Sequence, residues 1–280
     1  MQSESRDVLE GSVAVVTGAA RSIGLACARV MAEQGAAVIM TDVDREEGQA
    51  RCEALVADGL AVSFQPLDVT SEAGWSELMD RVLAQHGRLD VLVNNAGICL
   101  PSTLEALSFE DFSRMTSVNV DGTFLGCKAA ILAMRKSAPE GEAPRGSIIN
   151  IASIAGQTAI AGLGGYCTSK AAVTNMTKAL AIECAERREF IRVNSVHPGT
   201  VRSHMTETLY SSEYFEDPQN FASVPMKDYA LPDDIADAVV YLASADARLV
   251  TGSELTVDGG YTAGIGAVSY THLRAHETNP

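Results

Sequence analysis

The chain has 280 residues, of which 46% are hydrophobic and 20% are charged, and its formal net charge at pH 7 is −15. This composition excludes a disordered chain, and the negative charge argues against binding to nucleic acid or an anionic membrane, whose phosphates would be repelled. No uninterrupted apolar stretch of about 18 residues occurs, so we expect no transmembrane helix. The polar start, MQSESRDVLEG, lacks the apolar core of a signal peptide, which predicts a cytoplasmic location.

The cysteines and histidines show no spacing typical of a metal site, and no metal is predicted. Six cysteines are spread along the chain without a CxxC pair, a pattern typical of reduced thiols. His86, His197 and His204 have no ligand spacing, and we expect His197 to be structural, next to the turn at Pro198.

Seven short apolar runs alternate with longer segments of helical periodicity. Most of the runs are continuous, as in strands covered on both faces, and they lie at 13–17, 36–41, 61–67, 90–94, 147–151, 191–196 and 254–257. The first helix is expected in SIGLACARVMAEQG, with Gly35 at its end. Further helices are predicted at 44–57, 71–86, 108–135, 166–187 and 231–244. Ser108 with Asp111 predicts a capped helix start, and Pro232 suits a first helical turn.

This alternation predicts parallel β-α-β units with right-handed crossovers, and therefore a doubly wound α/β fold. No linker divides two cores, so we expect one domain over about residues 8–263. The segment 200–230 is a long connection without clear periodicity, which is typical of a lid. Residues 264–280 include SYTHLRAHET, which resembles translated cloning or sequencing-adapter sequence, and this tail is left out of the fold.

A glycine turn follows the first strand and opens the first helix, as TGAARSIG at 17–24. Gly18 permits a tight turn and Gly24 permits close helix–strand contact. The free N–H groups of the helix start, at Arg21, Ser22 and Ile23, suit the pyrophosphate of a dinucleotide. An ordinary β-α turn is the alternative interpretation.

Acidic residues end the second and third strands. Asp42 is placed to accept the ribose hydroxyls of the adenosine and to repel a 2′-phosphate, which favours NAD. Arg21 argues mildly for NADP, because a guanidinium pairs with phosphate. Asp42 is alternatively the cap of the next helix. Asp68 and Val69 are expected at the adenine edge, with a helix cap before Thr70 as the alternative for Asp68.

A possible catalytic set follows the fifth strand. Ser153 ends that strand, and Tyr166 and Lys170 share one face of the next helix at i and i+4. A neighbouring ammonium lowers the pKa of a phenol, so Tyr166 is expected to exchange a proton with an alcohol or ketone oxygen. Ser153 is expected to hold that oxygen by a hydrogen bond.

From residue 13 to 262 the chain resembles the short-chain dehydrogenase/reductase family. The matching segments are TGAARSIG at 17–24, NNAG at 94–97, Asn119 in SVNVDG, Ser153, YCTSK at 166–170, HPG at 197–199 and VDGGYTA at 257–263. The resemblance implies a seven-stranded parallel sheet in the order 3-2-1-4-5-6-7 and a homotetramer.

The resemblance also implies residue roles. Tyr166 would be the acid/base, Lys170 would bind the nicotinamide ribose, Ser153 would orient the substrate, and Asn119 would hold a water in a proton relay with Lys170. Two further sets would contact the cofactor: Asn95, Ala96 and Gly97 at the adenosine side, and Pro198, Gly199, Val201 and Ser203 at the carboxamide.

Two positions depart from the family pattern. Ser22 stands where glycine is usual, so we expect altered phosphate contact through its hydroxyl. Ser203 stands where threonine is frequent, and its hydroxyl is expected still to reach the carboxamide.

The segment 204–228 carries apolar side chains expected to close over the nicotinamide: Met205, Leu209, Tyr210, Tyr214, Phe215, Phe221 and Met226. Leu100, Ile154 and Leu163 are expected to add apolar wall. These features favour a small apolar ketone or secondary alcohol as substrate, of the alicyclic or hydroxysteroid type. The alternatives are packing of this segment in a subunit interface, a 3-oxoacyl carrier-protein reductase, a sugar dehydrogenase and a non-catalytic dinucleotide-binding protein.

Overall fold

The computed structural model describes residues 7–210 and 212–264. One parallel sheet of seven strands runs through it in the order β3-β2-β1-β4-β5-β6-β7, as expected. The strands are β1 (Val13–Thr17), β2 (Ala37–Asp42), β3 (Val62–Pro66), β4 (Val91–Asn94), β5 (Arg145–Ile151), β6 (Phe190–Pro198) and β7 (Glu254–Val257). The helices are α1 (Ser22–Glu33), α2 (Arg45–Ala57), α3 (Glu72–His86), α4 (Phe109–Thr116), α5 (Gly122–Lys136), α6 (Gly164–Glu186), α7 (His204–Leu209) and α8 (Pro232–Ala243).

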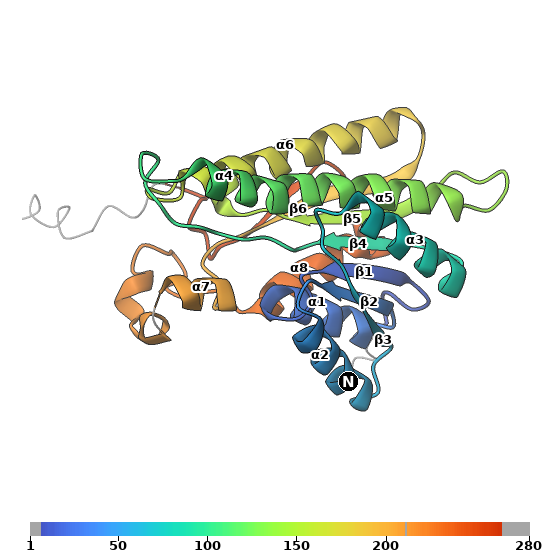
Figure 1. The fold of residues 1–280 in the computed structure, drawn as a ribbon, viewed down its shortest axis with the longest axis horizontal. Helices are drawn as coiled ribbons and strands as arrows, with labels where there is room; N and C mark the ends of the chain where they lie inside the picture. Colours follow the sequence, from blue (N-terminus) through green and yellow to red (C-terminus); the bar gives the residue numbers. More distant parts are fainter. Residues whose placement is uncertain (1–6, 211, 265–280) are drawn as a thin grey trace, which may run out of the picture.

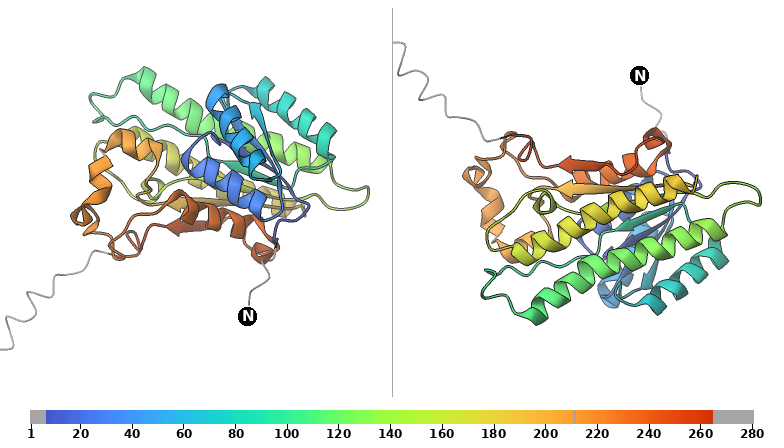
Figure 2. Two further views of the ribbon diagram at one scale, coloured as in Figure 1. Left: turned by 90° about the horizontal axis from the view of Figure 1, so that it is seen from below. Right: turned by 90° about the horizontal axis from the view of Figure 1, so that it is seen from above.

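Helices cover both faces of the sheet, in three layers (Figure 1). α1, α2 and α8 lie on one face, and α3, α5 and α6 lie on the other (Figure 2). Neighbouring residues of β1 point into different cores: Ala14 and Val16 into the first, Val13 and Val15 into the second. Burial on both faces explains why the strands are continuous apolar runs.

The strand order reverses beside β1, which pairs with both β2 and β4. Val15 lies opposite Ile39 on one side and Leu92 on the other. The chain therefore leaves the ends of β1 and β4 in opposite directions and opens a crevice there, the usual ligand position in such sheets.

The helix expected over 108–135 is interrupted. A π-helical turn at Ser117–Asp121 separates α4 from α5. At its centre, the side chain of Asn119 accepts a hydrogen bond from the N–H of Ile98 and donates one to its carbonyl, at 2.8 and 2.9 Å. These contacts with a distant loop accompany a change of pitch that hydrophobic periodicity does not register. The helix expected from 166 begins two residues earlier, at Gly164.

The segment 200–230 contains more structure than its sequence indicated. It holds α7 and two 3-10 turns, Ser212–Glu216 and Pro218–Phe221. These turns enclose a small apolar cluster of Phe215, Phe221 and Val224. In Figure 1 the segment lies beyond the carboxyl ends of the strands.

Two further observations concern the part of the chain that the structure describes. None of its helices is both long enough and apolar enough to cross a membrane. The tail expected at 264–280 lies outside the described residues except for Gly264.

Candidate active site

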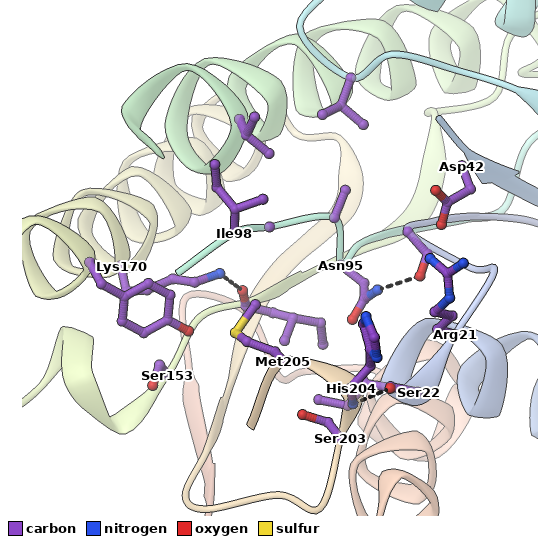
Figure 3. A pocket seen from close by; sticks show the side chains of 18 of the residues that line it. Arg21, Ser22, Asp42, Asn95, Ile98, Ser153, Lys170, Ser203, His204 and Met205 are labelled. Carbon is purple, nitrogen blue, oxygen red and sulfur yellow. Dashed lines mark hydrogen bonds between the residues drawn. The ribbon is translucent and has the colours of Figure 1, made fainter. Parts of the chain in front are cut away.

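A cavity of about 810 Å³ lies at the carboxyl ends of the central strands. It is lined by all but two of the residues that the sequence predicted for the site: Gly18, Arg21, Ser22, Ile23, Asp42, Asp68, Val69, Asn95, Ala96, Gly97, Ser153, Tyr166, Lys170, Pro198, Gly199, Val201 and Ser203. The exceptions are Gly24 and Asn119, which lie behind the wall. Figure 3 shows Ser153 and Lys170 at one side, Arg21 and Asp42 at the other, and Met205 between them.

The glycine turn packs so closely that side chains are excluded. Gly18 has φ of +63°, and a Cβ there would lie 2.9 Å from the Cα of Ala96. A Cβ on Gly24 would collide with the carbonyl oxygen of Gly18. These contacts bring α1 against the end of β1, and α1 begins without a side-chain cap. Its first amides therefore face the cavity, which fits the pyrophosphate of a dinucleotide.

The NNAG segment holds the turn in place. The side-chain amide of Asn95 donates to the carbonyls of Thr17 and Gly18, at 2.9 and 3.1 Å. The hydroxyl of Thr17 in turn accepts from the N–H groups of Asn95 and Ala96, at 2.9 and 3.0 Å. The ends of β1 and β4 are thereby joined into one rigid edge of the cavity.

The carboxylate of Asp42 is held by main-chain donors. It accepts from the N–H groups of Ala20 and Asp44, both at 3.0 Å. The cap of α2 is Asp44, so Asp42 is not the cap of that helix. Arg21 pairs with Asp44 at 2.6 Å, and the pKa of the Asp44 carboxyl is lowered first by the N–H of Glu47 and then by this guanidinium. The positive charge of Arg21 is therefore already paired with the carboxylate of Asp44.

Asp68 is not the cap of α3, because Ser71 takes that position, and Asp68 bonds to Thr70 instead. Its carboxylate accepts from the N–H and the hydroxyl of Thr70, at 2.9 and 2.7 Å, while the residue still lines the cavity.

At the other end, Tyr166 lies beside Ser153 and Lys170. Burial raises the pKa of Tyr166 above its ordinary value, and a hydrogen bond with the Ser153 hydroxyl opposes that rise. The expected lowering by Lys170 does not appear, because the ammonium lies 5.7 Å from the ring centroid and desolvation dominates. Without a positive charge in addition to that of Lys170, the phenol of Tyr166 stays protonated at neutral pH.

Lys170 is almost fully buried and is held by one main-chain acceptor. Its Nζ donates to the carbonyl of Ile151 at 2.8 Å. Desolvation lowers the pKa of this amine to about 8, so the amine is mostly charged at pH 7 and loses its charge just above neutral pH.

Asn119 holds the part of the cavity wall that contains Ile98. Besides its two bonds to Ile98, its amide donates to the hydroxyl of Ser169 at 2.9 Å. The chain atoms thus occupy its side-chain oxygen and its donors, and the water-holding role expected of it stays a prediction.

His197 does not line the cavity and contacts the chain at Ser153, which agrees with the structural role expected of it. Its ring is fully buried, with Nδ1 3.0 Å from the carbonyl of Ser153 and Nε2 2.8 Å from the hydroxyl of Ser195. Burial lowers the pKa of His197, so the ring is neutral and Nδ1–H donates to Ser153. The HPG motif at 197–199 was the sequence feature that could have indicated this contact.

The apolar wall is only partly as expected. Of the seven apolar side chains in 204–228, Met205 lines the cavity, whereas Phe215 and Phe221 pack on one another at 6.1 Å between ring centroids. Leu100, Ile154 and Leu163 do not line it. The aromatic rings are used to stabilise the segment itself. Among the described residues, no group of three or more His, Cys, Asp or Glu side chains is placed to hold a metal ion.

Comparison with known proteins places this geometry in a family. A family model described as enoyl-(acyl carrier protein) reductase matches residues 18–262. The chain belongs to the short-chain dehydrogenase/reductase family. A solved member, a short-chain type dehydrogenase/reductase from Mycobacterium marinum, superposes with a TM-score of 0.84 at 33% identity, covering 92% of this chain and 98% of that one.

Curated members of the family match along nearly their whole length. The NADP-dependent (R)-specific alcohol dehydrogenase of Lentilactobacillus kefiri is 37% identical over 92% of this chain and 99% of its own. The cyclopentanol dehydrogenase of Comamonas testosteroni is 38% identical, over 90% and 97%. The 3-alpha-(or 20-beta)-hydroxysteroid dehydrogenase of Mycobacterium tuberculosis strain H37Rv is 39% identical, over 92% of both chains.

Proposed function

We propose that this short-chain dehydrogenase/reductase is an NAD(H)-dependent oxidoreductase that interconverts apolar secondary alcohols and ketones. The observation that carries the proposal is the cavity itself, which has Tyr166, Ser153 and Lys170 at one end and an uncapped glycine turn with Asp42 at the other. The named activities of the relatives, on secondary alcohols, cyclopentanol and hydroxysteroids, support the substrate class.

The residues present fit a nicotinamide dinucleotide. The first turn of α1 would hold the pyrophosphate, Asp42 the adenosine ribose, and Lys170 with Pro198 and Gly199 the nicotinamide half. When bound, this cofactor supplies the hydride acceptor or donor.

The proton is handled by the chain. In reduction, Ser153 donates a hydrogen bond to the ketone oxygen and holds it beside the phenol, and Tyr166 then delivers its proton. Burial keeps Tyr166 protonated for this step. In oxidation, Tyr166 must lose that proton first, which requires the positive charge of Lys170 to stabilise the phenolate.

NAD is favoured over NADP by the charges around Asp42. A 2′-phosphate there would meet the carboxylates of Asp42 and Asp44, and Arg21 would have to leave its pairing with Asp44 to compensate. The relative from L. kefiri is named NADP-dependent, so this position needs a direct test.

The test is a set of initial rates with NAD and NADP against cyclic alcohols, aliphatic secondary alcohols and hydroxysteroids. We expect turnover of at least one class and a preference for NAD of about tenfold or more in kcat/KM, which corresponds to about 1.4 kcal/mol. A tenfold preference for NADP would contradict the role of Asp42. Absence of turnover with both cofactors would contradict the proposed oxidoreductase activity. As the family resemblance implies, we also propose a homotetramer in the cytoplasm, and sedimentation of the purified chain tests its size.

A further inference from the structure

Ser22 adopts a backbone conformation that favours glycine. It is the first residue of α1, and its φ is +50°, in the left-handed region that residues with a Cβ rarely enter. A glycine would take this conformation without steric cost. The serine therefore indicates that its hydroxyl makes an interaction that offsets the strain.

That interaction joins two distant parts of the chain. The Ser22 Oγ accepts a hydrogen bond of 2.9 Å from the main-chain N–H of His204, the first residue of α7 (Figure 3). First-turn amides of a helix lack partners inside the helix. The hydroxyl of Ser203 caps the N–H of Thr206, at 3.3 Å, and Ser22 provides a second cap from another element.

The Ser22 hydroxyl also has a proton to donate. A serine oxygen accepts and donates at the same time, and among residues 7–210 and 212–264 we find no acceptor for this proton. Ser22 lines the main cavity beside Ile23, in the turn where the pyrophosphate of the proposed cofactor would bind.

We propose that the Ser22 hydroxyl holds α7 and a cofactor phosphate together, accepting from the N–H of His204 and donating to a phosphate oxygen. The inference rests on the proposed function, since the cofactor must occupy this cavity. Ser22 is thus a positioning residue for the segment 200–230, which we call the substrate segment.

The consequence is a coupling between cofactor binding and the position of α7. Met205 and Thr206 on α7 line the cavity, so a cofactor that strengthens the Ser22 contact also stabilises this wall for the substrate. Coupling of this kind is reciprocal: a substrate that packs on α7 must strengthen cofactor binding by the same factor.

Two variants remove the two partners of this hydrogen bond separately. Ser22→Gly removes the hydroxyl and relieves the backbone strain, so its folding is not threatened. His204→Pro removes the N–H. Proline is favoured at the first position of a helix, and the preceding Ser203 has φ of −141° and ψ of 163°, as the residue before proline requires. His204→Ala is the matched control, because it loses the imidazole and keeps the N–H.

The readout is trypsin cleavage after Arg202 and Lys227, which flank α7 and the turns that follow it. Each variant is saturated with NADH, at a concentration set by fluorescence titration. We expect NADH to slow cleavage by about tenfold or more in the wild type and in His204→Ala, and by less than about threefold in Ser22→Gly and His204→Pro. The double variant should lose no more protection than either single variant.

Equal protection of Ser22→Gly and wild type would overturn the inference, as would additive effects in the double variant or no protection of the wild type by bound NADH. If the wild type bound neither NADH nor NADPH, the proposed function would fail as well, so the two failures are distinguishable.

Discussion

At the scale of single residues, burial decides the chemistry of the candidate site. Tyr166 and Lys170 are removed from water, which raises the pKa of the phenol and lowers that of the amine to about 8. Both shifts favour neutral side chains. The site without cofactor is therefore poised to donate a proton, and any additional positive charge would favour the phenolate.

Replacement of the phenol tests the acid/base role directly. Tyr166→Phe keeps the ring and removes the hydroxyl, so turnover should fall by about a hundredfold or more. NADH affinity by fluorescence titration should stay within about threefold, because the ring still fills its place. Tyr210→Phe, at a half-exposed tyrosine outside the cavity wall, is the control and should retain the wild-type rate. Substantial turnover by Tyr166→Phe would remove this residue from the mechanism.

The amine of Lys170 predicts a pH dependence. Its ammonium form is lost as the pH rises through about 8, so kcat/KM for NADH in ketone reduction should be level below that pH and decline above it. Lys170→Arg carries a charge that does not titrate in this range, and its profile should lose the decline, at a lower overall rate. A wild-type profile without inflection between about pH 6 and pH 9.5 would assign the proton transfer to other groups.

At the scale of elements, the site depends on how closely α1 approaches β1. Gly24 faces the carbonyl of Gly18, and the side-chain amide of Asn95 fills the remaining space. The spacing of TGAARSIG predicted this approach, since only glycine permits it. The π-helical turn at Ser117–Asp121 was not predictable, because contacts with a distant loop accompany it. The 3-10 turns at Ser212–Glu216 and Pro218–Phe221 were not predictable, because they accompany aromatic packing within the segment and have no periodic apolar face.

Gly24→Ala tests this close approach. The added Cβ meets main-chain atoms that cannot rotate away, so the free energy of unfolding should fall by about 2 kcal/mol or more, and NADH binding should weaken. Gly164→Ala is the control, since a Cβ there has no neighbour within 4 Å and φ is not positive. Urea unfolding of both variants measures the difference. If Gly24→Ala and Gly164→Ala were equally stable, α1 would be able to move away from β1 with little loss of free energy of unfolding.

At the scale of the whole molecule, the two main cores and the substrate segment are stabilised separately. The cores lie on the two faces of the sheet, whereas Phe215, Phe221 and Val224 form their own cluster beyond the strand ends. A segment with its own small cluster can open without global unfolding. The apolar side chains that the sequence assigned to the substrate therefore serve mainly to keep the segment folded.

Phe221→Ala should open this segment selectively. Removing a buried phenylalanine costs about 3 kcal/mol, which raises the open population by about a hundredfold, and trypsin cleavage after Lys227 should accelerate accordingly. The midpoint of global urea unfolding should move little. Met226→Ala, at a side chain that is 75% exposed, should change neither quantity. A large drop in the global midpoint with unchanged cleavage would show that the cluster belongs to the main cores.

The sequence by itself determined the alternation of strands and helices, the glycine turn and the placing of Tyr166 and Lys170 together, because these follow from local patterns: apolar runs, glycine spacing, and two side chains on one helix face. The strand order and the other cofactor contacts were expected from the family resemblance. Only the tertiary structure decided which groups those side chains meet. The pairing of Arg21 with Asp44, the bond from His204 to Ser22 and the burial of Lys170 join residues that are far apart in the chain or depend on its packing. Hydrogen bonds and desolvation act through space, and no spacing along the chain records them.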